Sequence, residues 1–286
     1  MIRRYRCTRC GRDIAVKASR NGNDRGWIHS EYATLCALQP AFAQHAEYGV
    51  LDPLAYFTMD DREVMVTQWF AGRDFGAYLQ TLDDDDLVAA AAGAGGWLHT
   101  LHASHGAVAS GTPNTADKLE YLTETYGTAL LGDPRTRNPM DLLRVHALEI
   151  EHLRLCEVPI HGDFKPENLL CDGRRYVGLD IQLRSHAIAA YDLAPFLNHV
   201  WLAGHGARRV RLEHRYAHIE AAFLNGYGVS TDEERYVVRW ALLYYVLCQL
   251  GSYRQRGWVA SCYGDWKLGP LLRLRALGLR RSGAMA

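Results

Sequence analysis

The chain has 286 residues, of which 48% are hydrophobic and 22% are charged, and its 32 basic side chains balance its 32 acidic ones. This composition is typical of a globular protein that is long enough for one large domain or two lobes. The formal net charge of zero argues against a general attraction to nucleic acid, so no nucleic-acid partner is expected.

The cysteines and the N-terminus favour a cytoplasmic protein. Seven scattered cysteines do not form the regular pattern of a disulfide framework. The arginines near the N-terminus precede no apolar stretch, so no signal peptide is expected. Cys7 and Cys10 have the spacing of half a metal site, but a structural zinc site needs about four ligands. We therefore interpret this pair as part of a hairpin turn.

Residues 1–70 are predicted to form short strands around one helix. Strands are expected at 14–16 and 64–67, where β-branched and apolar residues are concentrated. The apolar residues of 30–38 recur at helical spacing, which predicts a helix between the two strands. Gly72 then breaks the pattern, and it marks the expected connection to a second lobe.

From residue 71 onward the sequence favours helices, which we predict at 87–102, 114–126, 140–156 and 230–250. The aspartate run at 83–86 is interpreted as a helix start, since acidic residues there accept free N–H groups and complement the helix dipole. The sequence STDEE at 230–234 has the form of a capping box.

A non-helical stretch at 158–180 interrupts these helices. It contains two short apolar runs joined by Asp172 and Gly173, residues that suit a tight hairpin turn. The loop that enters this hairpin has the sequence HGDFKPENLL, so an aspartate, Asp163, lies five residues before an asparagine, Asn168. A second aspartate, Asp180, follows the second apolar run.

Phosphoryl transfer requires these residue types. The reaction depends mainly on positioning and on neutralising charge, with a carboxylate near the incoming hydroxyl and hard oxygen ligands for Mg²⁺. Asp163 would orient or deprotonate the hydroxyl group. Asn168 and Asp180 would hold the metal ion.

The segment at 161–170 resembles the catalytic loop shared by protein kinases and by the aminoglycoside phosphotransferase family, which includes choline-kinase-like enzymes. The sequence GLDI at 178–181 resembles the metal-binding strand of the phosphotransferases. Weaker similarities are found at 97–102, 191–194 and 223–228.

This resemblance implies an α+β, two-lobed protein-kinase-like fold. Residues 1–70 would form a small β-rich N-lobe that binds nucleotide phosphates. Residues 71–286 would form a larger helical C-lobe with the catalytic loop and the acceptor site.

The resemblance also implies roles for residues around the loop. His161 would pack under the loop, and Asp192 would accept hydrogen bonds from its backbone. Lys165 would contact the transferred phosphate, or it is an exposed lysine, and the sequence leaves both readings open.

In the N-lobe, Lys17 would bind the α- and β-phosphates of ATP or GTP, and Glu31 would hold the lysine. The adenine would meet backbone groups near Gln68, Trp69 and Phe70.

The sequence departs from the family before Lys17. Members usually have a strand, a phosphate-covering loop and another strand there, whereas sixteen residues with one glycine and five arginines precede this lysine. Either the true start lies upstream or the N-lobe is abbreviated. In the second case the arginines would substitute for the loop amides at the phosphates, or they form a solvated hairpin.

The expected activity is ATP-dependent transfer of phosphate, with Mg²⁺, to a hydroxyl group of a small molecule such as an aminoglycoside-like antibiotic, a sugar or an amino alcohol. Gly162 replaces an arginine that many protein kinases use, and eleven residues between Asp180 and Asp192 leave little room for peptide docking. A pseudokinase that regulates by binding nucleotide is one alternative.

Another alternative is an envelope-associated or lipid-associated sugar kinase, because residues 267–286 read as a basic amphipathic helix that could touch a membrane surface weakly. That helix could instead pack its leucines on the C-lobe. The sequence does not determine the oligomeric state.

Overall fold

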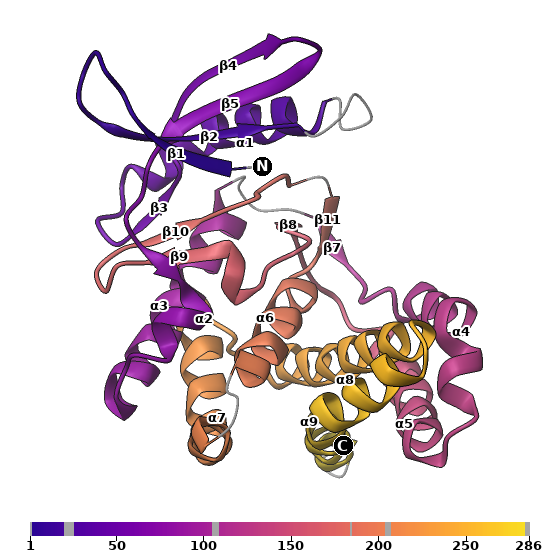
Figure 1. The fold of residues 1–286 in the computed structure, drawn as a ribbon. Coiled ribbons are helices and arrows are strands. Elements are labelled where there is room, and N and C mark those ends of the chain that lie inside the picture. Colours follow the sequence, from indigo (N-terminus) through magenta and orange to yellow (C-terminus); the bar gives the residue numbers. More distant parts are fainter. Residues whose placement is uncertain (1, 20–25, 105–108, 184, 204–206, 284–286) are drawn as a thin grey trace.

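The computed structural model describes the chain except for residues 1, 20–25, 105–108, 184, 204–206 and 284–286. A small lobe of strands around one helix lies above a larger helical lobe (Figure 1). The predicted α+β, two-lobed architecture is therefore confirmed.

The small lobe contains an antiparallel sheet with the strand order β1-β2-β5-β4. Its strands are β1 (Ile2–Arg6), β2 (Asp13–Ala18), β4 (Pro53–Met59) and β5 (Arg62–Gln68). The β4–β5 turn consists of Asp60 and Asp61, whose φ angles of 48° and 60° are those of a two-residue hairpin turn. The predicted strands at 14–16 and 64–67 are the centres of β2 and β5.

Helix α1 (Trp27–Phe42) packs on this sheet and is longer at both ends than the predicted helix. Leu35 and Leu38 lie on its buried face, which follows the helical period. Glu31 lies on the same buried face and is 3% exposed. A carboxylate in that position needs a cationic partner.

A second sheet with the order β3-β10-β9-β6 lies between the lobes. Its strands are β3 (Tyr48–Val50), β6 (Arg73–Asp74), β9 (Leu169–Cys171) and β10 (Tyr176–Gly178). β3 pairs with β10 in parallel, so a segment from the small lobe supports the predicted catalytic hairpin. The turn of that hairpin spans residues 172–175, and Asp172 accepts hydrogen bonds from the backbone N–H groups of Arg174 and Arg175.

The large lobe is built from helices α2 (Phe75–Leu79), α3 (Asp84–Ala103), α4 (Thr115–Leu131), α5 (Pro134–Ile150), α6 (Ala190–Ala203), α7 (Ala207–Tyr227), α8 (Asp232–Gln255) and α9 (Trp258–Gly283). Asp83 caps α3 by accepting from the N–H of Asp86, as the capping interpretation of the aspartate run predicted. Thr231 and Glu234 form the predicted capping box of α8.

One predicted helix extends wrongly into a strand. The helix expected at 140–156 ends at Ile150, and Leu155 and Cys156 begin strand β8 (Leu155–Ile160) instead. β8 pairs on one side with β7 (Ser110–Gly111) and on the other with β11 (Ser185–Ile188). These partners are distant in sequence, so local periodicity could not reveal them.

Helix α9 packs its leucines on the lobe, because Leu268, Leu271 and Leu279 are fully buried while Arg273 and Arg280 are exposed. The packing alternative for the basic C-terminal helix is therefore confirmed for these leucines. Within the described residues, no helix is long and apolar enough to cross a membrane.

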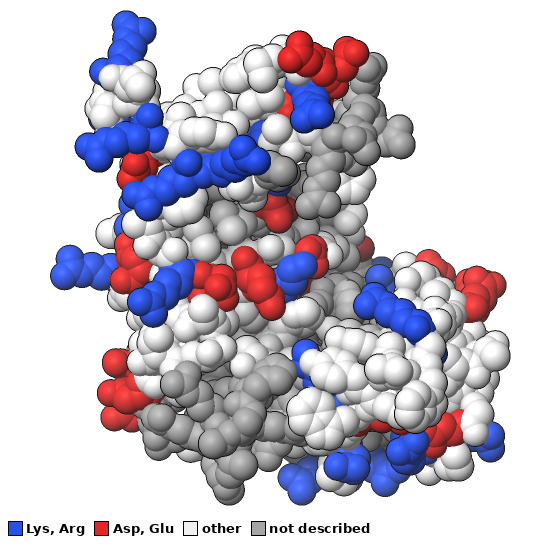
Figure 2. Space-filling model, in the orientation of Figure 1, with Lys and Arg blue, Asp and Glu red and all other residues white. Residues whose placement is uncertain are grey.

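The arginines that precede Lys17 lie on β1 and its turn, where all five are exposed: Arg3, Arg4, Arg6, Arg9 and Arg12. Figure 2 shows basic side chains gathered over this corner of the small lobe. Cys7 and Cys10 belong to the β1–β2 turn, as the hairpin interpretation predicted.

Candidate active site

The loop between β8 and β9 is held by one buried carboxylate. Asp192, in the first turn of α6, accepts hydrogen bonds from the backbone N–H groups of His161 at 2.6 Å and of Gly162 at 2.9 Å. Gly162 has φ +80°, a conformation that other residues rarely adopt, so the loop requires a glycine there. Asp192 thus has the scaffold contacts that the resemblance implied.

His102, near the end of α3, completes the environment of Asp192. Its Nε2 lies 3.1 Å from Asp192 Oδ2, and its Nδ1 lies 2.9 Å from the hydroxyl of Tyr227. Burial raises the pKa of Asp192, but the contacts with His102 and the loop amides outweigh it and hold the pKa below its ordinary value. Sequence analysis assigned no role to His102, although it lies in the family-like segment at 97–102.

Phe164 anchors the loop in the core. Its fully buried ring stacks on Phe196 of α6 at 4.6 Å and on Trp97 of α3 at 5.5 Å. Phe196 continues the stack to Phe223 of α7 at 4.6 Å. A Cβ atom at Gly178 of β10 would overlap the ring of Trp97, so this stack also fixes the hairpin. The residue beside Asp163 is therefore immobilised by helices from three parts of the chain.

Asp163 itself is exposed at the tip of this rigid loop. Lys165 Nζ lies 2.7 Å from Asp163 Oδ2. Asn168 is buried, and its Nδ2 donates to the backbone oxygen of Asp163 at 2.8 Å and to Asp163 Oδ2 at 3.2 Å. His161 Nε2 donates to the backbone oxygen of Leu179, so the ring packs under the loop. The structure thus brings Asp163, Lys165 and Asn168 together.

Asp180 lies just after β10 and contacts the small lobe. Its φ of +53° is unusual for a residue other than glycine, which marks a constrained position. Lys17 Nζ lies 2.5 Å from Asp180 Oδ1 and 2.5 Å from Glu31 Oε2. Burial lowers the pKa of Lys17, but the two carboxylates outweigh it and raise the pKa above its usual value. Lys17 of the small lobe is therefore paired with one carboxylate of its own lobe, Glu31, and with one outside it, Asp180.

The residues around Asp163 include oxygen ligands suited to a hard metal ion. The Nδ2 of Asn168 is committed to Asp163, which leaves Asn168 Oδ1 as the ligand atom of that side chain. Asp180 supplies a carboxylate whose side chain is 47% exposed. An amide oxygen and a carboxylate form the kind of partial ligand set that Mg²⁺ completes with phosphate oxygens and water.

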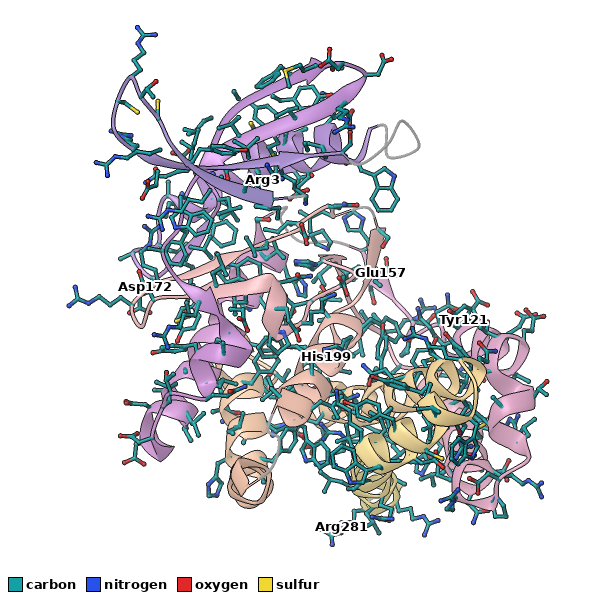
Figure 3. The ribbon with its side chains drawn as sticks, in the orientation of Figure 1. Arg3, Tyr121, Glu157, Asp172, His199 and Arg281 are labelled. Carbon is teal, nitrogen blue, oxygen red and sulfur yellow. The ribbon has the colours of Figure 1, made fainter. Side chains whose placement is uncertain are left out.

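The predicted adenine-contacting residues follow β5 between the lobes. The backbone N–H of Gln68 donates to the backbone oxygen of Asp52, and the backbone N–H of Trp69 donates to the backbone oxygen of Asp13. An adenine would therefore have to use their carbonyl groups or the backbone of Phe70. Arg4 of β1 lies over the Trp69 ring at 5.2 Å and pairs with Asp13 at 2.5 Å. Figure 3 shows Arg3 on the same strand, at the edge of the small lobe.

A cavity of about 610 Å³ lies beside the catalytic loop. Glu167, four residues after Asp163, lines it together with His199 of α6, labelled in Figure 3. The rest of its described lining comes from α2 and the residues that flank it, from the end of α6, and from α4, α8 with Arg256, and α9. Sequence analysis missed this cavity because its walls come from segments separated by long stretches of chain.

Comparison with known proteins agrees with this geometry. A family model described as the phosphotransferase enzyme family matches residues 3–238. A search of curated proteins gives no significant match.

Several solved structures are similar to this chain. One is an aminoglycoside phosphotransferase from Alicyclobacillus acidocaldarius, with a TM-score of 0.62, 16% identity and coverage of 99% of this chain and 93% of that one. Another is an amicoumacin kinase in complex with AMP-PNP, Ca²⁺ and its ligand, with a TM-score of 0.59, 16% identity and coverage of 97% and 84%. A third is a macrolide 2′-phosphotransferase from Brachybacterium faecium, with a TM-score of 0.59, 14% identity and coverage of 94% and 92%. At these identities the likeness shows a shared fold.

Proposed function

Because this chain belongs to the phosphotransferase enzyme family, we propose that it transfers the terminal phosphoryl group of ATP or GTP to a hydroxyl group of a small molecule. The observation that carries this proposal is a chain of contacts. Asn168 holds Asp163, the backbone oxygen of Asn168 accepts from the N–H of Leu179, and the next residue, Asp180, pairs with Lys17. We assign residues 1–70 to nucleotide-phosphate binding and residues 71–286 to catalysis and acceptor binding.

Asp163 acts on the acceptor. Its carboxylate is exposed, while its backbone and its Oδ2 are held by Asn168. It orients the incoming hydroxyl group and takes up the proton as the oxygen attacks. Lys165, bound to the same carboxylate, stabilises the charge of the transferred phosphate.

Lys17 and the metal ligands act on the nucleotide. Lys17, held by Glu31, binds the α- and β-phosphates. Asn168 and Asp180 would hold Mg²⁺, which would neutralise charge on the phosphates. The AMP-PNP and Ca²⁺ in the amicoumacin kinase complex support a nucleotide with a divalent cation. Backbone groups at Gln68, Trp69 and Phe70 would hold the base.

The acceptor enters the cavity beside Glu167. Glu167 lines this cavity and lies four residues after Asp163 on the same loop, which supports an approach of the acceptor from the large lobe. The names of similar structures include aminoglycoside and macrolide phosphotransferases, which favours a compound of moderate size. An aminoglycoside-like antibiotic, a sugar and an amino alcohol remain candidates.

Calorimetric titration of Mg·ATP into the chain tests this proposal. We expect binding in the wild type and at least about tenfold weaker binding in Asp180→Ala, because a metal ligand is lost. Asp141→Ala, which removes an exposed carboxylate from α5, serves as the control and should leave the affinity unchanged. Equal affinities of Asp180→Ala and the wild type would contradict the assignment of Asp180.

A further inference from the structure

We propose that the acceptor carries an anionic group, and that Arg256 and Lys267 bind this group in the cavity beside Glu167. This inference rests on the proposed function, because it names the class of molecule that the acceptor site takes. It follows from how charge is distributed over the described cavity lining.

The two carboxylates in the described cavity lining, Glu167 and Asp74, lie on the catalytic loop and on β6 beside it. The short 3-10 helix η2 (Pro166–Asn168), which contains Glu167, packs against α2, α6 and β6. Asp74 caps α2 by accepting from the N–H of Ala77 at 2.9 Å. Glu167 lies 3.7 Å from His199 Nδ1, and its hydrogen bond with His199 lowers the pKa of Glu167. Both carboxylates therefore already have a partner within the protein.

The arginine and the lysine in the described lining, Arg256 and Lys267, lie at the end of α8 and on α9. Arg256 follows α8 and lies over the ring of Tyr253 at 5.8 Å, and Lys267 of α9 lies over the ring of Tyr263 at 5.7 Å. Neither cation forms an ion pair with a carboxylate in the part of the chain that the structure describes. Their contacts with ring faces leave both charges without an anionic partner.

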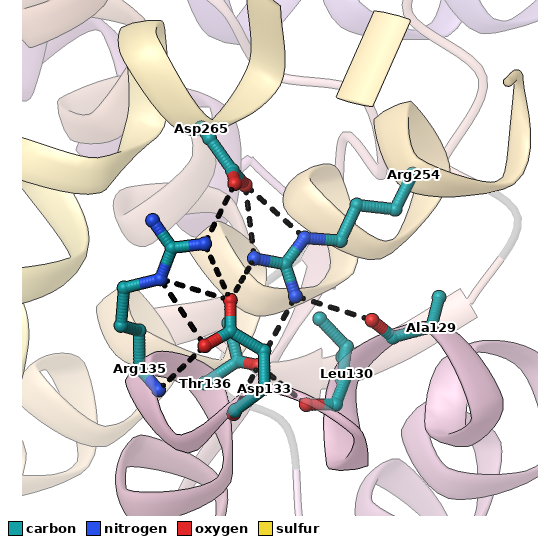
Figure 4. A network of polar contacts seen from close by, with 7 residues as sticks. All are labelled: Ala129, Leu130, Asp133, Arg135, Thr136, Arg254 and Asp265. Atoms are coloured by element: carbon teal, nitrogen blue, oxygen red, sulfur yellow. Dashed lines mark hydrogen bonds and ion pairs between the residues drawn. The ribbon is translucent and has the colours of Figure 1, made fainter. Parts of the chain in front are cut away.

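Two acidic side chains, Asp133 and Asp265, bind other arginines and not these two cations (Figure 4). Arg254 Nη2 binds Asp133 Oδ2 at 2.7 Å and Asp265 Oδ1 at 2.9 Å. Arg135 binds the same two carboxylates from the other side. Asp265 lies two residues before Lys267 on α9, yet its carboxylate faces this network. The two cations in the cavity are thus left for a ligand.

This distribution suits an anion better than a polyamine. A polyamine would meet two carboxylates that already have partners and two unpaired cations, and like charges repel. A molecule with a carboxylate or phosphate group at one end would pair with Arg256 and Lys267. Its hydroxyl-bearing end would then point toward Glu167 and the catalytic loop. Tyr126 and Tyr253 add aromatic rings to the lining, and the cavity volume suits a small molecule.

Matched sugars test the proposal. Binding of glucose, glucosamine, glucuronate and glucose 6-phosphate to the chain loaded with Mg·AMP-PNP is measured by saturation-transfer NMR titration. The four sugars share the glucose ring and differ in charge. The bound nucleotide occupies the site for its own phosphates, so the anionic sugars cannot bind there. We expect the two anions to bind at least about tenfold more tightly than glucosamine, as charge-assisted contacts allow.

The double variant Arg256→Gln/Lys267→Gln should abolish this preference, while Lys267→Arg should retain it. Arg273→Gln removes an exposed cation from the same helix outside the cavity and serves as the matched control. The lack of any preference for the anions, or a preference that persists in the double variant, overturns the proposal. Nucleotide affinity is measured separately in each variant, so a failure of the proposed kinase activity is distinguishable from a failure of this inference.

Discussion

Lys17 Nζ, on β2 of the small lobe, lies 2.5 Å from Asp180 Oδ1, at the end of β10 in the other half of the molecule. One ion pair thus joins residues that are 163 positions apart in the sequence. The side chain that is proposed to bind phosphates and the side chain that is proposed to bind metal are therefore already adjacent.

Replacing Lys17 with methionine should weaken Mg·ATP binding by about tenfold or more, because a charge-assisted contact to phosphate is worth roughly 1.5–3 kcal/mol. The variant also leaves Glu31 buried without a cation, so its thermal stability should fall. Calorimetry and a thermal melt measure the two effects. Lys118→Met, whose ammonium lies over the Tyr191 ring, is the control and should keep wild-type nucleotide affinity. Unchanged affinity in Lys17→Met would remove Lys17 from the nucleotide site.

Asp163→Asn should lower the rate of phosphoryl transfer by about 10²–10⁴-fold, the range for loss of a general base. The proposed metal ligands Asn168 and Asp180 remain, so Mg·ATP affinity should change little. Transfer is followed by ADP release with an acceptor, and affinity by calorimetry. Loss of nucleotide binding in a variant with an intact circular dichroism spectrum would contradict this division of roles.

His102→Ala should destabilise the chain by about 1–3 kcal/mol at neutral pH, because Asp192 stays buried and loses a hydrogen-bond donor. The folded-state pKa of Asp192 is depressed, so its contribution is present above the unfolded pKa of about 3.9 and is lost as the pH falls through the folded pKa. Removing His102 raises that folded pKa. The acid-unfolding midpoint should therefore move to higher pH, and an unmoved midpoint would argue against this coupling.

Asp133→Asn tests the network in Figure 4. Hydrogen bonding from Arg135 and then Arg254 holds the pKa of Asp133 far below its ordinary value. The contribution of ionised Asp133 to the stability of the fold is therefore complete above pH of about 4, and it is lost as the pH falls further. In chemical unfolding, the free energy of unfolding of the variant should be about 1–3 kcal/mol lower than that of the wild type at pH 7, and this difference should shrink toward pH 3. A deficit that does not depend on pH would indicate that shape, and not charge, holds α5 to α9.

The parts of the fold that follow local rules could be predicted from the sequence. The strand around Lys17, the cap at Asp83 and the capping box at Thr231 depend on residues a few positions apart. The catalytic loop was recognisable because Asp163 and Asn168 lie in one short segment. In contrast, Leu155 and Cys156, the first residues of β8, were predicted to end a helix, since the stability of this strand comes from partners at 110–111 and 185–188.

The side chains that hold the catalytic loop in place were harder to predict from the sequence than the reactive residues of the loop. His102 lies ninety positions from Asp192, and Phe164 stacks on rings of α3 and α6, with Phe223 of α7 continuing the stack through Phe196. A histidine and a phenylalanine in apolar surroundings have no spacing that would reveal such contacts. The cavity was missed for the same reason, because packing of α2, α6, α8 and α9 creates it.

The ring stack around Phe164 also determines how the catalytic loop exchanges its amide protons with water. The N–H groups of His161 and Gly162 are bound to a carboxylate that is completely buried beside that stack. These protons can be released only when the aromatic core of the large lobe opens. The loop that bears the most exposed reactive carboxylate of the site should therefore belong to the slowest-exchanging cooperative unit of the molecule.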